Sequence, residues 1–96
     1  MKYLHKFSAT WCSPCKRLQR NLSEIDLLSF SVTLIEHDVD LMERPELARR
    51  GVRGVPTLIL MDESGVELDR KTGALTADDI RKWLVLDYDA IPSGTA

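Results

Sequence analysis

Long apolar runs are missing from this chain of 96 residues. No stretch approaches the roughly 18 apolar residues that a membrane-spanning helix needs, so we expect no membrane partner. The first residues are too polar for the apolar core of a secretory signal, which predicts a cytoplasmic protein. With 13 basic and 15 acidic residues, the chain also lacks the positive excess of a nucleic-acid-binding domain. A composition of 44% apolar and 29% charged residues is typical of one globular domain.

Cysteine is scarce as well, with only Cys12 and Cys15, separated by two residues. A structural disulfide stabilises most when it closes a long loop, and this pair would close almost none. A secreted domain of this size usually carries more bridges, which favours a reducing compartment. The pair therefore indicates redox chemistry and not scaffolding.

A zinc site is one alternative, because Cys-x-x-Cys is half of such a site. The chain has no second cysteine pair, and His5 and His37 lack the spacing of a zinc finger. We therefore predict no metal site.

Charge is unevenly distributed along the chain. Residues 1–20 contain five basic and no acidic residues, and residues 21–40 contain five acidic and no basic residues. One interpretation is that the charged residues lie on solvated faces of different elements. The alternative is that the basic residues cluster around Cys12 and favour its thiolate. The basic residues are Lys2, Lys6, Lys16, Arg17 and Arg20.

The first half of the chain alternates between strand and helix signals. Residues 3–8 are rich in aromatic and apolar side chains, which predicts a strand. Apolar residues then recur at helical spacing after Cys15, and Pro14 suits the first turn of that helix. Residues 31–36 predict a second strand. Asp40 and Glu43 have the spacing of a capping box before a short helix that ends at Gly51.

The second half predicts a hairpin and a last helix. Residues 57–61 are almost entirely apolar, as in a central strand, and residues 66–71 alternate like a half-exposed partner strand. Thr76 and Asp79 have capping-box spacing before a helix with an apolar stripe. The stripe consists of Ile80, Trp83, Leu84 and Tyr88.

These elements predict an α/β fold with a four-stranded mixed sheet in the order βαβ-α-ββα and with helices on both faces. The first two strands should be parallel, joined by a right-handed crossover. We expect one domain over residues 1–89 and a flexible C-terminal tail over residues 90–96.

The two cysteines lie where the first strand passes into the first helix. Cys12 should therefore sit at a helix N-terminus, where the dipole and the free N–H groups favour a thiolate. Cys15 should lie one turn further in and be partly covered. We expect Cys12 to act as the nucleophile and Cys15 as the resolving thiol.

Three segments resemble the thioredoxin family. The first is Trp11-Cys12-Ser13-Pro14-Cys15-Lys16, in which Ser13 stands where glycine is usual; the others are Gly51-Val52-Arg53-Gly54-Val55-Pro56-Thr57 and Gly73-Ala74-Leu75. The resemblance covers roughly residues 3–88, nearly the whole chain. The resemblance implies a thioredoxin-like fold and a monomer that reduces protein disulfides. It also implies a redox-active disulfide without another cofactor, and a thioredoxin reductase as electron donor.

The resemblance also implies a surface that binds the substrate. Pro56 is expected to be cis and to face the cysteines, and Val55 to offer its backbone to an extended peptide. Lys16 is expected to favour the Cys12 thiolate. The surface would be completed by Trp11, Ser13, Pro14, Gly73 and Ala74.

Two departures from the family stand out. The strand and helix that precede the active-site strand in full-length thioredoxins are absent, which suggests a shortened form. The family also pairs a buried aspartate with a lysine on the next strand, whereas those positions here hold Lys6 and Glu36. We expect these two to form a semi-buried ion pair, with Glu36 as the base for Cys15, or else to lie separately in solvent.

Two other functions remain open from the sequence. A glutaredoxin-like reductant that uses glutathione would carry threonine before the cis-proline and a Gly-Gly turn, where this chain has Val55 and Gly73 alone. A redox-silent binding subunit of a larger complex would not need the intact cysteine pair. Proline before the second cysteine is typical of the reducing members of the family, which favours a protein disulfide reductase.

Overall fold

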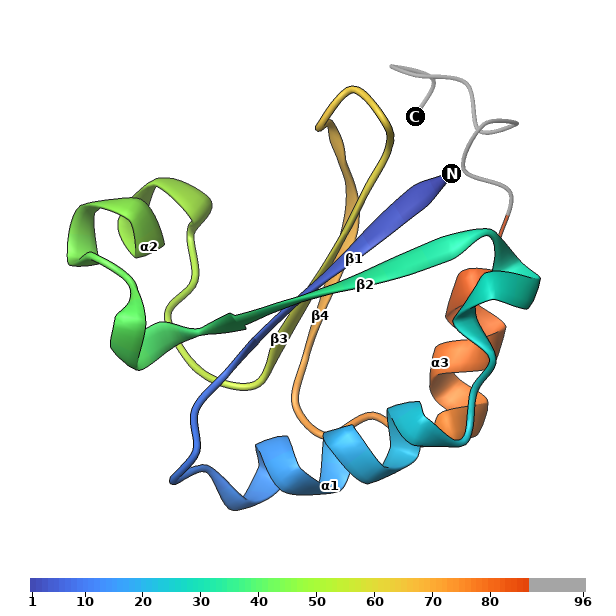
Figure 1. Cartoon of the computed structure of the whole chain (residues 1–96), viewed down its shortest axis with the longest axis horizontal. Helices are drawn as coiled ribbons and strands as arrows, with labels where there is room; N and C mark the ends of the chain where they lie inside the picture. Colours follow the sequence, from blue (N-terminus) through green and yellow to red (C-terminus); the bar gives the residue numbers. More distant parts are fainter. Residues whose placement is uncertain (87–96) are drawn as a thin grey trace.

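The computed structural model describes residues 1–86, which form one mixed sheet and its covering helices (Figure 1). The predicted domain boundary at residue 89, the predicted tail and Tyr88 lie outside the described residues. The elements are β1 (Lys2–Ser8), α1 (Ser13–Ser23), β2 (Val32–Asp38), α2 (Arg44–Arg50), β3 (Thr57–Met61), β4 (Glu67–Thr72) and α3 (Ala77–Leu84), with short 3₁₀ turns η1 (Leu27–Phe30) and η2 (Val39–Leu41).

The four strands lie in the order β2-β1-β3-β4. β1 is parallel to β2 and antiparallel to β3, and β4 is antiparallel to β3. This confirms the predicted four-stranded mixed sheet with a parallel first pair. Because β1 is central, its C-terminal end delivers the chain into α1 from the middle of the sheet.

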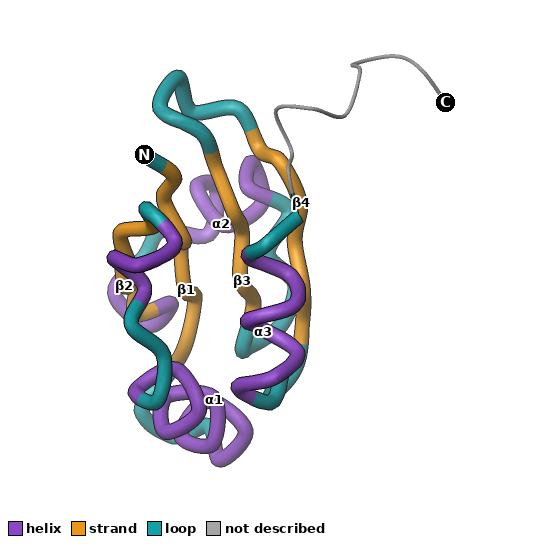
Figure 2. The backbone as a smooth tube through the Cα atoms, turned by 90° about the vertical axis from the view of Figure 1, so that its right-hand side faces the viewer, coloured by secondary structure: helices purple, strands orange, loops and turns teal. Residues whose placement is uncertain are grey.

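α1 and α3 pack on one face of the sheet, and α2 lies on the other (Figure 2). Alternate residues of the central strands point at the first pair of helices, so Leu4, Leu58 and Leu60 are completely buried. The predicted apolar stripe of α3 is confirmed for Ile80, Trp83 and Leu84, which are buried in this core. Burying about ten such side chains is the main contribution to stability in a domain of this size.

The opposite face carries a stacked group of rings under α2. The fully buried Phe7 ring stacks on His37, with centroids 4.5 Å apart, and Nδ1 of His5 lies 2.8 Å from Nε2 of His37. The guanidinium of Arg50, the last residue of α2, lies 5.7 Å from the centroid of Phe7. Burial is the main cause that lowers the pKa of both histidines. The charge of His37 further lowers the pKa of His5, and the charge of Arg50 further lowers the pKa of His37.

One of the two predicted capping boxes was wrong. α2 begins after Glu43, whose side chain makes no capping hydrogen bond. The Asp40 carboxylate accepts a hydrogen bond from Trp11 instead, and η2 occupies the chain between β2 and α2. The second box is confirmed, because Thr76 and Asp79 exchange both hydrogen bonds at the start of α3. Gly51 ends α2 with a φ of 67°, as predicted.

Candidate active site

The two cysteines are joined in a disulfide at the junction of β1 and α1. Cys12 is the N-cap of α1, and its Sγ accepts a hydrogen bond of 3.1 Å from the backbone N–H of Cys15. Their Cα atoms are 5.2 Å apart. Pro14 lies in the first turn, where its missing N–H removes no helical hydrogen bond. The predicted place of Cys12 at a helix N-terminus is confirmed.

The two cysteines do not differ in exposure, contrary to the expectation that only Cys15 would be covered. Each residue is 4% exposed. Ala9 packs with both cysteines, and Val39 of η2 and Val55 of the loop before β3 pack against this small cluster. What distinguishes Cys12 is its position at the helix N-terminus, where the Cys15 N–H points at its sulfur.

Pro56 brings the second and third motifs to the cysteines. The Val55–Pro56 peptide bond is cis, and Val55 packs against the cysteine cluster. The Pro56 carbonyl oxygen accepts a hydrogen bond of 3.1 Å from the N–H of Gly73. In the described part of the chain, nothing hydrogen-bonds to the backbone of Val55. Segments 40 to 60 residues apart in sequence therefore meet at one site.

A shallow groove runs from Trp11 to the cis-proline segment. It has a volume of about 340 Å³. The Trp11 indole is 67% exposed and donates a hydrogen bond of 2.9 Å to the Asp40 carboxylate. Sequence reasoning missed Asp40 in this role, since nothing local to it signals a partner 29 residues away. The groove is lined by Trp11, Val39, Leu47, Val52, Arg53, Gly54 and Val55.

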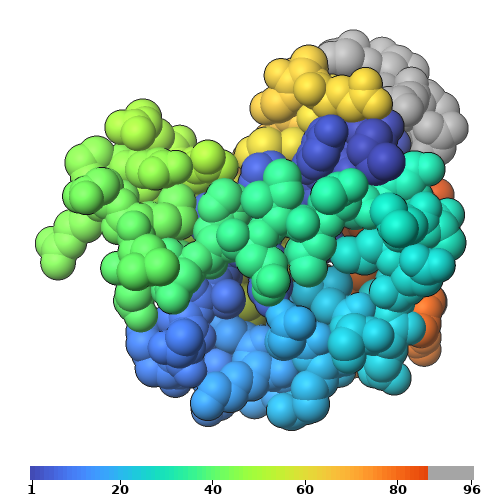
Figure 3. Space-filling view, in the orientation of Figure 1, coloured from blue at the N-terminus to red at the C-terminus, as the bar shows by residue number. Residues whose placement is uncertain are grey.

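The other predicted contact residues lie around this groove without lining it. Ser13 is exposed and Pro14 is half-buried at the start of α1. Gly73 and Ala74 are half-buried in the loop before α3, where the Leu75 carbonyl accepts a hydrogen bond of 2.9 Å from the Asn21 side chain of α1. This contact ties the third motif to the active-site helix. Figure 3 shows the surface of the molecule from the side of Figure 1.

Lys6 and Glu36 meet as neighbours on β1 and β2. They are directly paired in the parallel register, and Lys6 Nζ lies 2.6 Å from Glu36 Oε1. Lys6 also donates a hydrogen bond to the Gln19 side chain of α1. The lysine is 3% exposed, whereas the glutamate is 58% exposed. The pair therefore has one buried and one solvated member.

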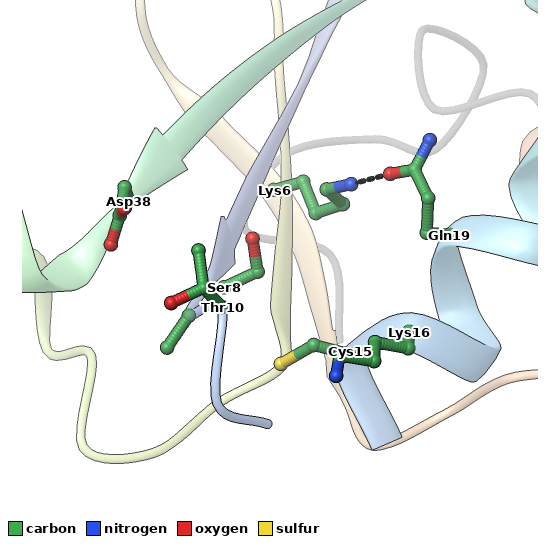
Figure 4. Close-up of a pocket in the computed structure, with 8 residues that line it drawn as sticks. Lys6, Ser8, Thr10, Cys15, Lys16, Gln19 and Asp38 are labelled. Carbon is green, nitrogen blue, oxygen red and sulfur yellow. Dashed lines mark hydrogen bonds between the residues drawn. The ribbon is translucent and has the colours of Figure 1, made fainter. Parts of the chain in front are cut away.

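A second pocket opens beside Cys15, between the ends of β1 and β2 and the start of α1 (Figure 4). It has a volume of about 390 Å³. Lys6 and Lys16 both line it, so two of the five basic residues in the first 20 positions lie in the same pocket as Cys15. Glu36 is not part of the lining. The lining residues are Lys6, Ser8, Ala9, Thr10, Cys15, Lys16, Gln19 and Asp38.

Residues 1–86 contain no group of three or more histidine, cysteine or acidic side chains that could hold a metal ion. Over the same residues, no helix is long and apolar enough to cross a membrane.

Comparison with known proteins agrees with the geometry of the site. The family model described as thioredoxin matches residues 1–85. A thioredoxin of Rickettsia bellii is 32% identical over 81% of this chain and 73% of its own length, and one of Buchnera aphidicola is 35% identical over 85% and 75%. Thioredoxin H5 of Oryza sativa is 38% identical, but the match spans only 49% of its length.

Solved structures give the same result. The crystal structure of thioredoxin NaTrxh from Nicotiana alata has a TM-score of 0.74 and 28% identity, covering 88% of this chain and 70% of that one. The germline-specific thioredoxin Deadhead of Drosophila melanogaster has a TM-score of 0.73 and 25% identity over 86% and 77%. With the cysteine pair at the start of α1 and the sheet order described above, these matches place the chain in the thioredoxin family of dithiol oxidoreductases.

Proposed function

We propose that this protein reduces disulfide bonds in other proteins, with Cys12 as the nucleophile. The observation that carries this proposal is the position of Cys12 at the N-cap of α1, bonded to Cys15 and covered by the cis-proline segment. In the reduced protein, the Cys12 thiolate attacks a substrate disulfide, and one substrate sulfur leaves as a thiolate. Cys15 then attacks Cys12, the mixed disulfide breaks, and the second substrate sulfur leaves. Two electrons pass from the dithiol to the substrate.

Local charge supports Cys12 as the attacking thiol. The dipole of the eleven-residue α1 and its free N–H groups favour an anion at the N-terminus. Lys16 follows in the next turn, and its backbone N–H bonds to the Cys12 carbonyl oxygen at 3.2 Å. We assign Lys16 the role of favouring the Cys12 thiolate.

The substrate is an extended segment that lies along the Trp11 groove and pairs with the backbone of Val55. The apolar lining of the groove supports this assignment. The backbone N–H and C=O groups of Val55 support it too, because they make no hydrogen bond within the described residues. Main-chain pairing gives affinity for many sequences, because it does not depend on side chains. The rim of the surface is formed by Ser13, Pro14, Gly73 and Ala74.

We assign the Lys6–Glu36 pair a role in the charge beside Cys15, in which Lys6 favours the Cys15 thiolate and Glu36 holds the lysine in place. The pairing supports a joint role, since Lys6 lines the pocket beside Cys15 and Glu36 connects the lysine to solvent. Glu36 as the base for Cys15 stays a prediction of the sequence.

The electrons for the next cycle come from an external donor, for which we propose a thioredoxin reductase in the cytoplasm. The redox-active Cys12–Cys15 disulfide then needs no other cofactor. The thioredoxin signatures around Ser13, Val55 and Gly73 favour this donor over glutathione.

Reduction of insulin disulfides tests the proposed function. The protein is assayed with NADPH and a thioredoxin reductase, with glutathione and glutathione reductase, and with dithiothreitol alone. We expect the first donor to support turnover at least ten times faster than the second. The Cys12→Ser, Cys15→Ser double variant is the inactive control. Failure with every donor would leave a redox-silent binding module as the function.

A further inference from the structure

Among residues 1–86, Asp38 is the one carboxylate that lines the pocket beside Cys15. It is the last residue of β2 and pairs with Ser8 in the parallel register. Because side chains alternate along a strand, Asp38 shares the face of the sheet that carries Lys6 and Ser8 toward α1. In Figure 4 the side chains of Ser8 and Thr10 lie between Asp38 and Cys15.

One oxygen of Asp38 is held in place and the other is available. Oδ1 accepts a hydrogen bond of 3.0 Å from the backbone N–H of Asp40, which caps η2. Oδ2 has no hydrogen-bond partner within residues 1–86. The carboxylate is therefore fixed by one oxygen while the other can accept a proton.

Water in the pocket can carry a proton between the Cys15 thiol and the Asp38 carboxylate. A molecule of liquid water takes about 30 Å³, so a pocket of about 390 Å³ holds several. The hydroxyls of Ser8 and Thr10 and the amide of Gln19 offer such waters hydrogen-bond partners. The charged groups that face the pocket are Lys6 from β1 and Lys16 from α1, and both favour the thiolate that remains when the proton has left.

Glu36 is less well placed for this task. It is 58% exposed, does not line the pocket, and its carboxylate is already engaged by Lys6. It lies on the same strand and two residues from Asp38, so the pattern of the sequence alone does not separate the two.

We propose that Asp38 accepts the proton of Cys15, through water in this pocket, when Cys15 resolves the mixed disulfide. The step rests on the proposed function. The Cys15 thiol transfers its proton through water to Asp38, and its sulfur bonds to Cys12. The bond between Cys12 and the substrate sulfur breaks, and that sulfur leaves with the electron pair. Asp38 then releases the proton to solvent.

The test follows both steps with the aromatic disulfide 5,5′-dithiobis(2-nitrobenzoate). Cys12 releases a first coloured thiolate and Cys15 a second, so stopped-flow absorbance separates attack from resolution. We expect Asp38→Asn to slow the second phase about tenfold at pH 7 and to leave the first phase unchanged. General-base assistance contributes up to 10²–10⁴-fold, and transfer through water reduces this. The loss should shrink at higher pH, where more Cys15 is already ionised.

Asparagine keeps the oxygen that caps η2, so the variant removes the base and retains the fold. Asp26→Asn is the matched control, because Asp26 is the N-cap of η1 and lies outside the pocket. Ser8→Ala with Thr10→Val tests the path independently and should also slow the second phase. Added acetate should restore part of the rate in Asp38→Asn.

The proposal is overturned if Asp38→Asn and the Ser8, Thr10 variant both resolve at the wild-type rate from pH 6 to 9. A greater loss in Glu36→Gln than in Asp38→Asn would also overturn it and assign the proton to Glu36. Absence of the first phase in the wild-type protein is a different result, since it contradicts Cys12 as the nucleophile and hence the proposed function itself.

Discussion

The backbone N–H of Gly73 donates a hydrogen bond of 3.1 Å to the carbonyl oxygen of Pro56. This bond joins the loop before α3 to the cis-proline that follows Val55, and Val55 packs against the cysteines. Gly73 has a φ of 89°, which a residue with a side chain rarely adopts, although a Cβ placed there would meet no atom within 4 Å. The requirement for glycine is therefore conformational and not steric.

Gly73→Ala should lower the free energy of unfolding by about 1 kcal/mol or more, because alanine is strained at positive φ. It should also weaken insulin reduction by loosening the support of Pro56. Urea denaturation and insulin turbidity measure the two effects. For the free energy of unfolding, the matched control is Gly54→Ala, since a Cβ at Gly54 meets nothing within 4 Å and its φ lies outside the positive range that alanine avoids. Equal losses of unfolding free energy in both variants would contradict the role of Gly73.

The Lys6–Glu36 pair should respond asymmetrically to substitution. Glu36→Ala leaves a buried ammonium with Gln19 as its one remaining partner in residues 1–86, which we expect to cost about 1–2 kcal/mol of unfolding free energy. Lys6→Met leaves a carboxylate that is already solvated and places an apolar chain in a buried site, so it should cost less. Chemical denaturation of the two variants checks the order, and a reversed order would contradict it.

Stability should decrease as the pH falls below about 6.5, the ordinary pKa of histidine. Burial lowers the pKa of His5 and His37 in the folded protein, so the unfolded chain binds more protons than the folded chain in this range. The two neutral rings contribute fully to the free energy of unfolding above the pKa that histidine has in the unfolded chain. This contribution is lost as the pH falls toward the lower pKa values of His5 and His37 in the folded protein.

Urea midpoints measured from pH 7.5 to 5 test this dependence. The acidic loss should be smaller in His5→Gln, which removes one of the two titrating rings. A wild-type profile that is flat over this range, or a variant with an unchanged slope, would contradict the assignment.

Trp11→Phe should reduce insulin turnover several-fold while changing the reaction with a small aromatic disulfide much less. The indole covers one end of the groove and is held by Asp40, so its loss affects an extended substrate and not the cysteine chemistry. Asp40→Asn keeps an acceptor for the indole N–H and serves as the control, with a smaller expected loss. Equal losses with both substrates would indicate a disturbed cysteine pair.

Local features of this protein could be predicted from the sequence because neighbouring residues decide them. Pro14 in the first turn of α1, the capping box of Thr76 and Asp79, and Gly51 at the end of α2 each depend on a few adjacent backbone groups. The capping box predicted for Asp40 failed, because a tryptophan 29 residues away takes its carboxylate. Spacing alone does not show which of several partners a side chain will have.

The sequence itself determined three features, since spacing and period require no coordinates. These are the cysteine pair, the alternation of strands and helices, and the reversed charges of Lys6 and Glu36. Only the tertiary structure decided that Gly73 holds Pro56, that both cysteines are covered equally and that Asp38 shares a pocket with Cys15. The first and the last of these relationships join residues 17 and 23 positions apart. They depend on the register of β1 and β2 and on how α1 and the loops pack over the end of the sheet, which no local pattern encodes.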